Sequence, residues 1–452
     1  MDQVNTLRRY GLFDAKVPRY TSYPPANRFT VGTGAVHHKD WLAIVPEDQP
    51  LSLYIHIPFC RRLCWFCACR TQGTRSLAPV EAYVETLLSE IDVVARMLPA
   101  LRPTMARLHL GGGTPTLLSA GLMKRLLDRL FTRFAPTSDF ELSTEVDPTE
   151  ADRSVLDVLV ARGMTRASVG VQDFAPKVQK AIGRIQGVEV TRDVISYLRD
   201  RGVRSLNIDF LYGLPYQTAE SLSRTLDQVV ALGPDRLALY GYAHVPHVSK
   251  RQVMIPSSAL PGGEARFLMA QLARERLVEL GYQPIGIDHF ARRWDGLVRA
   301  CRARTLTRNF QGYTDDPFAT LLGLGASAIS KFPQGYVQNA VATSAYIRRV
   351  EAVGFAGQKG AVLTADDKLV AALIDAIMCY GAIDEVGVVA RFPDRRTEVN
   401  RMLLRLKKTF PDLVDPAAAG LALKADLTAA ARLIAAELDR SGVERNHHSA
   451  AV

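Results

Sequence analysis

Residues 54–69 read Tyr54-Ile55-His56-Ile57-Pro58-Phe59-Cys60-Arg61-Arg62-Leu63-Cys64-Trp65-Phe66-Cys67-Ala68-Cys69. The stretch begins inside an apolar run, Leu51–Ile57, that predicts a β-strand. It continues as Cys-x₃-Cys-x₂-Cys, with one more cysteine two residues on. Thiolates are the ligands of iron–sulfur clusters, and three thiolates on one short loop can bind three irons of a [4Fe–4S] cube. We therefore predict a cluster held by Cys60, Cys64 and Cys67 directly after a strand.

Such a cluster leaves its fourth iron without a protein ligand. S-adenosylmethionine (SAM) can bind that iron through its amino and carboxylate groups, and an electron passed into the sulfonium then yields a 5′-deoxyadenosyl radical. The alternative is a zinc knot made from all four cysteines, with His56 in reserve. Structural zinc sites usually use two pairs of closely spaced ligands that are separated by a longer loop. No second pair of such ligands follows the cysteine loop in this sequence.

Outward from this loop, short apolar runs alternate with longer helical patterns as far as Tyr242. The expected strands are Leu51–Ile57, Arg107–Leu110, Phe140–Val146, Ala167–Val171, Ser205–Leu211 and Leu237–Tyr240. The expected helices are Pro79–Leu98, Ala120–Phe134, Glu150–Ala161, Val188–Arg201 and Ala219–Leu232. Repeated βα units form a parallel sheet with right-handed crossovers. Because a closed barrel needs eight units, roughly six predict an α/β fold with an incomplete, TIM-like (β/α)₆ barrel.

Unusual residues stand at the ends of these strands. They are Gly111-Gly112-Gly113-Thr114-Pro115, Glu145, Gln172, Asp209 and Tyr242-Ala243-His244. The carboxyl ends of the strands form the active-site face of parallel α/β barrels, so we expect these residues in one site.

Each of these residue types has a use in binding SAM. Glycines let the backbone approach a ligand closely, which suits the amino-acid end of SAM. Glu145 could accept the ammonium or a ribose hydroxyl, Asp209 suits ribose hydroxyls, and Arg184 could pair with a carboxylate at two points. The alternatives are a tight turn for the glycines, a surface carboxylate for Glu145 and a surface ion pair for Arg184.

The two ends of the chain differ from its centre. Residues 1–46 show no strong periodicity and contain a proline-bearing extended segment, Arg19–Pro25. After about Val350, amphipathic patterns at Asp366–Met378 and Leu427–Leu438 predict helices. We therefore divide the chain into an N-terminal extension (1–46), the barrel (47–350) and a mostly helical C-terminal domain (351–452), whose last ten residues are expected to be disordered.

Composition narrows the functional class. The chain is 48% hydrophobic and 23% charged, as globular proteins are. No apolar run reaches about 18 residues and no signal-peptide pattern is present, so we expect a cytoplasmic protein without a membrane partner. Four of the six cysteines share one loop, and Cys301 and Cys379 are interpreted as buried small side chains. The net charge of +10 is spread without a long basic run, which predicts no nucleic-acid partner but suits an anionic substrate.

At these residues the chain resembles the radical SAM superfamily and, within it, the oxygen-independent coproporphyrinogen III oxidases. The three-cysteine spacing identifies only the superfamily. The narrower resemblance covers nearly the whole chain and depends on Cys69 and the tyrosine-rich Tyr20–Pro24. The chain departs from the family pattern at Ala68, where glycine is common, and at Trp65 and Arg70. The other matching segments are His56–Cys60, Gly111–Thr116, Glu145–Pro148, Gly170–Asp173, Asn207–Asp209 and Tyr212–Pro215.

The resemblance implies an oxidoreductase of heme biosynthesis that binds one [4Fe–4S] cluster and two SAM molecules. Cys69 would be an essential catalytic residue that is not a cluster ligand. The cluster-bound SAM would contact Tyr54, Gly112, Glu145 and Ile329. The second SAM would contact Phe66, Gly113, Thr114, Gln172, Arg184, Asp209 and Ala243.

The resemblance also implies a reaction and its partners. Members of the family oxidatively decarboxylate two propionates of coproporphyrinogen III to vinyl groups, giving protoporphyrinogen IX, CO₂, methionine and 5′-deoxyadenosine. The expected partners are a tetrapyrrole with four propionates and an electron-donor protein, and the enzyme is expected to be a monomer. A related heme chaperone is the main alternative, although such proteins generally lack the fourth cysteine and the tyrosine-rich segment. A heme-degrading methyltransferase is a further alternative.

Overall fold

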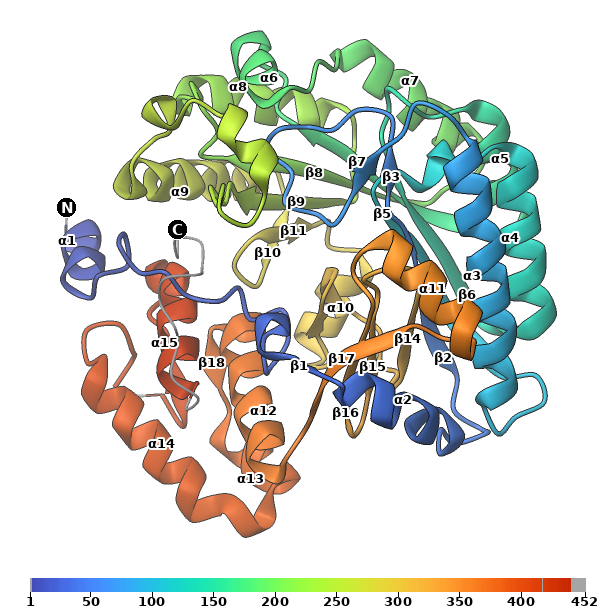
Figure 1. Cartoon of the computed structure of the whole chain (residues 1–452). Helices are drawn as coiled ribbons and strands as arrows, with labels where there is room; N and C mark the ends of the chain where they lie inside the picture. Colours follow the sequence, from blue (N-terminus) through green and yellow to red (C-terminus); the bar gives the residue numbers. More distant parts are fainter. Residues whose placement is uncertain (1, 417, 440–452) are drawn as a thin grey trace.

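The computed structural model describes residues 2–416 and 418–439; the tail predicted to be disordered lies outside this part. One sheet dominates it, in the order β1-β17-β16-β15-β14-β2-β5-β6-β7-β8-β9-β11-β10 (Figure 1). Its central strands run parallel from β14 to β9. These are β14 (Leu321–Leu324), β2 (Leu51–Ile57), β5 (Thr104–Gly112), β6 (Ala135–Val146), β7 (Met164–Gln172), β8 (Ser205–Tyr212) and β9 (Arg236–Gly241).

Helices cover the outer face of the curved parallel sheet (Figure 1). The fold class predicted from the βα alternation is confirmed: the end strands β1 and β10 do not pair with each other, so the barrel stays incomplete. Each expected strand and helix of the six βα units is present, with bounds that differ by a few residues. The outer helices are α3 (Ala78–Met97), α4 (Ala120–Arg133), α5 (Arg153–Ala161), α6 (Pro176–Ile182), α7 (Val188–Asp200), α8 (Ala219–Ala231) and α9 (Gly263–Glu279).

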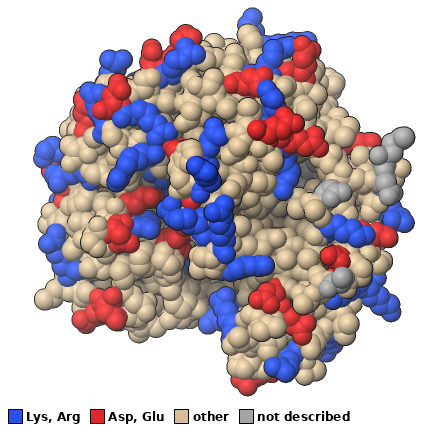
Figure 2. All heavy atoms as spheres, turned by 180° about the vertical axis from the view of Figure 1, so that it is seen from behind, with Lys and Arg blue, Asp and Glu red and all other residues tan. Residues whose placement is uncertain are grey.

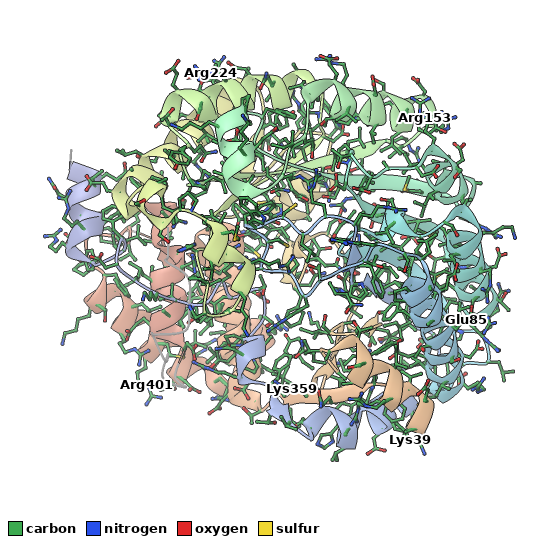
Figure 3. All side chains as sticks on the ribbon, turned by 45° about the horizontal axis from the view of Figure 1, so that its top comes forward. Lys39, Glu85, Arg153, Arg224, Lys359 and Arg401 are labelled. Carbon is green, nitrogen blue, oxygen red and sulfur yellow. The ribbon has the colours of Figure 1, made fainter. Side chains whose placement is uncertain are left out.

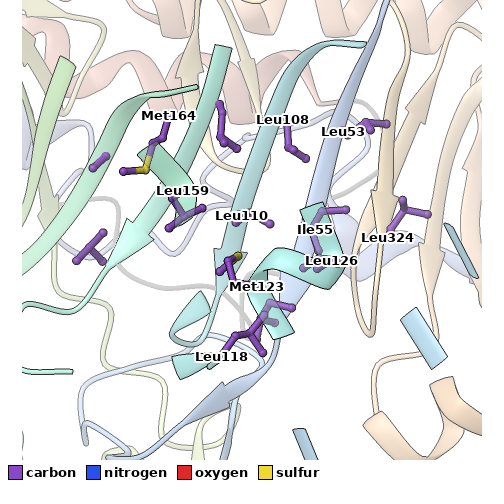
Figure 4. Close-up of a cluster of buried hydrophobic side chains, with 14 of the residues drawn as sticks. Leu53, Ile55, Leu108, Leu110, Leu118, Met123, Leu126, Leu159, Met164 and Leu324 are labelled. Atoms are coloured by element: carbon purple, nitrogen blue, oxygen red, sulfur yellow. The ribbon is translucent and has the colours of Figure 1, made fainter. Parts of the chain in front are cut away.

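The strands bury one face and leave the other polar. Leu53 and Ile55 of β2 and Leu108 and Leu110 of β5 are at most 1% exposed and belong to the core that includes helix α4 (Figure 4). Because successive strand residues point to opposite faces, the alternate positions face the inside of the barrel. There the sequence places Ser52, Tyr54, His56, Arg107 and His109, which line a cavity. The barrel interior is therefore hollow and polar rather than filled with apolar side chains.

Antiparallel strands extend the sheet on both sides. Those beyond β14 are β15 (Ile329–Phe332), β16 (Gly335–Asn339), β17 (Gly357–Val362) and β1 (Thr30–Val31). Those beyond β9 are β11 (His289–Ala291) and β10 (Gln283–Ile285). Three short ladders of the described chain stand apart. They are β3 (Phe59–Cys60) with β4 (Gln72–Gly73), β12 (Thr307–Asn309) with β13 (Gly312–Thr314), and β18 (Ala382–Ile383) with β19 (Leu421–Ala422). Helices α2 (Thr33–Ala43), α10 (Gly296–Arg302) and α11 (Thr343–Val353) complete this part.

A second core joins the two ends of the chain. Leu7 and Leu12 are fully buried in it against C-terminal residues such as Leu369 and Leu406. Helix α1 (Asp2–Arg9) and helix α15 lie on the same side of the molecule in Figure 1. The division of the chain at residues 46 and 350 stays a prediction. The C-terminal elements are α12 (Ala365–Tyr380), β18 (Ala382–Ile383), α13 (Glu385–Arg391), α14 (Arg396–Thr409), β19 (Leu421–Ala422) and α15 (Ala431–Leu438).

The N-terminal segment 17–23 is fixed by buried polar contacts. Arg308 donates to the carbonyls of Arg19 and Tyr20, at 3.0 and 2.9 Å. Arg432 donates to the carbonyls of residues 17 and 18. The hydroxyls of Tyr20 and Tyr23 both reach Asp439, near the end of the described chain, at 3.2 and 3.3 Å. No described helix has the length and apolar character needed to cross a bilayer.

Candidate active site

A hollow of about 740 Å³ occupies the barrel interior, and its lining includes the carboxyl ends of the parallel strands. Ile329 is the one predicted site residue that does not line it. This residue lies on β15, separated from Tyr54 by Gly323 of β14, which pairs with Tyr54 in the sheet. The structure brings the other predicted residues together around the hollow: Tyr54, Cys60, Cys64, Phe66, Cys67, Cys69, Gly112, Gly113, Thr114, Glu145, Gln172, Arg184, Asp209 and Ala243.

The cysteine loop is held from two sides. On one side the backbone N–H of Trp65 donates to the carbonyl of Ile182 at 2.9 Å, and the Trp65 ring packs on Gly183 at the end of α6. On the other side, residues 249–252, which follow β9, donate to three carbonyls of the loop. These bonds run from Ser249 Oγ to Cys67 (2.9 Å), from Arg251 Nη2 to Cys69 (3.2 Å) and from Gln252 Nε2 to Phe66 (2.8 Å).

The three glycines at the end of β5 are required by close packing against the cysteine loop and the neighbouring strands. A Cβ on Gly113 would lie 2.5 Å from the carbonyl oxygen of Phe59 and 2.9 Å from Cys60 Sγ. A Cβ on Gly111 would lie 2.8 Å from Glu145 Oε1. Gly112 has φ +119°, a conformation that residues with a Cβ rarely adopt. The glycine run therefore brings the end of β5 directly against the base of the cysteine loop.

Polar groups surround the cysteine sulfurs. The backbone N–H of Cys69 donates to Cys67 Sγ at 3.4 Å, and Arg184 Nη1 donates to Cys64 Sγ at 3.6 Å. Hydrogen bonding from Cys69 lowers the pKa of the Cys67 thiol to about 6, whereas the adjacent Cys67 sulfur raises the pKa of Cys69. Burial raises the pKa of Cys60 to about 11, partly opposed by a hydrogen bond from Thr114. Cys69 is exposed to the hollow.

Two carboxylates line the same hollow from β6 and β8, the strands on either side of β7. Glu145 accepts from the backbone N–H of Gly112 at 3.1 Å. Asp209 accepts from Ser168 Oγ at 2.8 Å and from Asn207 Nδ2 at 2.7 Å. Burial raises the pKa of Asp209, partly offset by these hydrogen bonds. Both carboxylates are therefore held in place by their own chain, with room in the hollow for a further donor.

Arg184 is a fixed structural arginine. It is 7% exposed, and it contacts Asp147 through one nitrogen only, at 2.9 Å. Its other nitrogens donate to the carbonyl of Gly170 at 2.8 Å and to Gln186 at 3.0 Å. The side chain thus connects β6, β7 and the cysteine loop. The carboxylate that it contacts belongs to Asp147 of the same chain.

Sequence reasoning placed no histidine in the SAM site, and it considered His56 only as a reserve ligand of the zinc alternative. His56 Nε2 lies 3.1 Å from the carbonyl of Arg70, and its Nδ1 lies 2.9 Å from the hydroxyl of Tyr54. Because a carbonyl only accepts, Nε2 carries the proton and Nδ1 accepts from Tyr54. The ring of His109 stacks on Tyr54, with centroids 5.9 Å apart. The inward alternation of the strands could have identified both histidines, whereas nothing local marks Phe310, which lines the hollow from the β12–β13 hairpin.

A buried carboxylate stands behind β14. Glu90 of α3 is fully buried and accepts from the backbone N–H of Gly325, from Asn339 Nδ2 and from the hydroxyl of Tyr346, each at 2.8 Å. Burial raises the pKa of Glu90 to about 7. These bonds fix the turn that follows β14 next to the site.

Comparisons with known proteins give the family. The sequence pattern of the Radical SAM superfamily matches residues 54–229. A relative from Paracoccus denitrificans, named oxygen-independent coproporphyrinogen III oxidase, is 47% identical over 453 residues, 100% of both chains. This chain belongs to the oxygen-independent coproporphyrinogen III oxidases. A member of that family from Bradyrhizobium diazoefficiens is 42% identical over 88% of both chains.

A solved structure agrees with this membership. It is the Escherichia coli coproporphyrinogen III oxidase, whose description calls it a radical SAM enzyme. It superposes with a TM-score of 0.87 at 38% identity, over 93% of this chain and 97% of that one. The resemblance based on the cysteine loop and the tyrosine-rich segment is thus confirmed.

The donor set of this oxidase-family chain fits the cluster that radical SAM proteins bind. Cys60, Cys64 and Cys67 stand on one loop, face one hollow, and each receives a hydrogen bond at or near its sulfur. Hydrogen bonds to sulfur favour the thiolate that iron requires. No three described His, Cys, Asp or Glu side chains converge on a single-ion position. In a cubane the three thiolates bind three separate irons, so their sulfurs need not meet at one point.

Proposed function

We propose that this protein is an oxidoreductase of anaerobic heme biosynthesis that converts coproporphyrinogen III to protoporphyrinogen IX. Each of two propionates loses CO₂, one hydrogen atom from the carbon β to the carboxylate, and one electron, and becomes a vinyl group. The observation that carries the proposal is the single hollow in which the cysteine loop and the polar ends of the parallel strands meet. A relative that matches the full chain is named for this reaction.

The cofactors belong to the same proposal. Cys60, Cys64 and Cys67 hold a [4Fe–4S] cluster, and the hollow takes two SAM molecules. Bound there, cluster and SAM together supply the 5′-deoxyadenosyl radical that removes the hydrogen atom. We assign Tyr54, Gly112, Glu145 and Ile329 to the first SAM and Phe66, Gly113, Thr114, Gln172, Arg184, Asp209 and Ala243 to the second. Because Ile329 lies outside the lining, its assignment has the least support from the geometry.

The chain's own contribution is positioning and shielding. Segment 249–252 and the neutral His56 donate hydrogen bonds to backbone carbonyls of the cysteine loop. These bonds hold the cluster ligands at a fixed position relative to the rest of the site. Glu145 and Asp209 present carboxylate oxygens at fixed positions to a ligand's hydroxyl or ammonium groups. Cys69 lies beside the three proposed ligands and is exposed to the hollow. We propose Cys69 as the catalytic residue that is not a cluster ligand.

The partners follow from the substrate's charge. Lys and Arg exceed Asp and Glu by ten, and in Figure 2 a group of basic side chains gathers near the centre of the face shown, among interspersed acidic ones. A positive field concentrates anionic ligands, which suits a tetrapyrrole with four carboxylates. We also propose that the enzyme is a cytoplasmic monomer and that a separate electron-donor protein reduces it.

One anaerobic assay tests the function. Protein reconstituted with iron and sulfide receives SAM, a reductant and coproporphyrinogen III, and both 5′-deoxyadenosine and the tetrapyrrole product are measured. We expect protoporphyrinogen IX with SAM consumption. SAM cleavage that leaves coproporphyrinogen III unchanged would contradict the assignment, and stoichiometric heme binding without turnover would favour a chaperone.

A further inference from the structure

A second cavity, of about 480 Å³, lies beside the active-site hollow. It is enclosed by the end of β9, helix α9, the N-terminal segment and residues 425–432 of the C-terminal part. The two hollows share four lining residues, Arg19 and the stretch Gly241-Tyr242-Ala243. They therefore meet at the end of β9, on either side of one short piece of backbone.

The walls of this arginine cavity carry more positive than negative charge. Its three carboxylates are Glu275, Glu279 and Asp288, of which Asp288 bonds His289 at 2.7 Å and Glu279 faces Arg276 at 3.4 Å. The five arginines are Arg19, Arg266, Arg274, Arg308 and Arg432. Within the described chain, no ion pair joins the first four of them to a carboxylate.

Several of these guanidinium groups have unused hydrogen-bonding capacity. Arg308 is 7% exposed, and its Nε has no partner in the described chain; the same holds for Nε of Arg266. Arg266 uses another nitrogen to bond the carbonyl of Tyr242 at 2.7 Å. Arg274 is half-buried, and burial lowers its pKa, with no charged neighbour to compensate. Asp288 supplies a counter-charge to Arg19 and Arg308, whereas no carboxylate of the described chain acts on Arg266 or Arg274. Removing these two cationic groups from water without a counter-charge is costly, so the arrangement favours a bound anion.

We propose that the arginine cavity binds the two propionates that the reaction leaves intact. This inference rests on the proposed function. A propionate that reacts must lie in the hollow at the cysteine loop, and a macrocycle placed across the shared wall at Arg19 and Gly241–Ala243 carries its remaining propionates into the second cavity. Arginine suits this ligand, since its guanidinium matches a carboxylate at two points.

This placement has a kinetic consequence. The two retained propionates are the same in substrate, transition state and product. Their contacts are therefore uniform binding, which lowers KM without raising kcat. Arg274 is the most informative position, because Arg308 and Arg432 also fix the N-terminal segment and Arg266 bonds the end of β9.

The test compares Arg274→Gln with Arg224→Gln in the reconstituted holoenzyme. Arg224, on the neighbouring helix α8, points away from the molecule in Figure 3 and pairs only with Glu220 in the described chain. For Arg274→Gln we expect KM for coproporphyrinogen III to rise about tenfold to a hundredfold, the size of one lost charged hydrogen bond, with kcat within about twofold. Arg274→Lys keeps the charge and should give an intermediate KM, and Arg224→Gln should leave KM unchanged.

The outcomes separate the two proposals. If Arg274→Gln leaves KM unchanged, or lowers kcat alone, the proposal that the arginine cavity binds the propionates is wrong. Normal turnover by the unmodified enzyme would still support the proposed function. If the unmodified enzyme cleaves SAM but does not convert coproporphyrinogen III, the function fails and this inference fails with it. If Arg274→Gln does not fold, the KM of Arg274→Lys decides: a value equal to that of the unmodified enzyme counts against the proposal.

Discussion

Replacing Gly113 with alanine tests whether the glycine run serves the cysteine loop. The added Cβ would lie 2.5 Å from the Phe59 carbonyl oxygen, whereas real Cβ atoms stay at least 3.0 Å away, so backbone must move by 0.5 Å or more. Overpacking of this kind costs about 1–3 kcal/mol. Because the same Cβ would lie 2.9 Å from Cys60 Sγ, the displacement falls on a proposed iron ligand. We expect Gly113→Ala to lose most of its cluster.

The assay is iron content and visible absorbance after anaerobic reconstitution, together with thermal unfolding. Gly121→Ala is the matched control, because a Cβ added at this position of helix α4 would meet no described atom within 4 Å. That change should keep the cluster and stabilise the chain by about 0.5–1 kcal/mol. If Gly113→Ala binds iron as fully as Gly121→Ala, the close approach does not position Cys60 and the reasoning is wrong.

Three further predictions concern the same region. Cys69→Ser should keep its iron and lose tetrapyrrole turnover; loss of iron would mean that Cys69 is a cluster ligand. Gln252→Leu deprives the carbonyls of Phe66 and Ala243 of a donor, and at about 1–3 kcal/mol for a buried unsatisfied group it should lower the melting temperature and the yield of reconstituted cluster. Burial raises the pKa of Glu90 to about 7 from 4.5, so the folded chain binds this proton more tightly than the unfolded chain. Its contribution to stability is therefore complete below about pH 4.5 and is lost as pH rises to 7, by up to about 3 kcal/mol at about 1.36 kcal/mol per pH unit. Glu90→Gln should flatten that part of the pH profile in denaturant titrations, and an unchanged slope would contradict it.

The barrel could be predicted because its strands carry a clear two-residue alternation. Leu51–Ile57 was predicted with the bounds that the structure has. Helix α5 begins at Arg153 rather than Glu150, because Asp152 caps it by accepting from the backbone N–H of Ser154. An acidic residue before an apolar run was a local signal that could have placed this boundary.

The rest depends on contacts between distant parts of the sequence. Helix α2 was not predicted, and its Gly34 is needed because the backbone of β17 at Gln358 and Lys359 passes directly over it. The hydrogen bonds that hold the cysteine loop come from residues 249–252, far away in the sequence. Ser249 and Cys67, for example, are about 180 residues apart. Glu145, Gln172 and Asp209 could be found because they stand at strand ends. Tyr54, Phe66 and Ile329 came only from the family resemblance, and Ile329 stands in the antiparallel extension of the sheet, where the strand-end rule does not apply.

The contacts of the tyrosine-rich segment set an order for biosynthesis. Tyr20, Tyr23 and Arg28 all bond the carboxylate of Asp439, so these contacts cannot form until residue 439 has left the ribosome. The barrel core, which ends far earlier in the sequence, can assemble around an open mouth in the meantime. Residues 20–28 are thus fixed later than the barrel residues that follow them in the sequence, and a truncation that removes Asp439 would release Tyr20 and Tyr23.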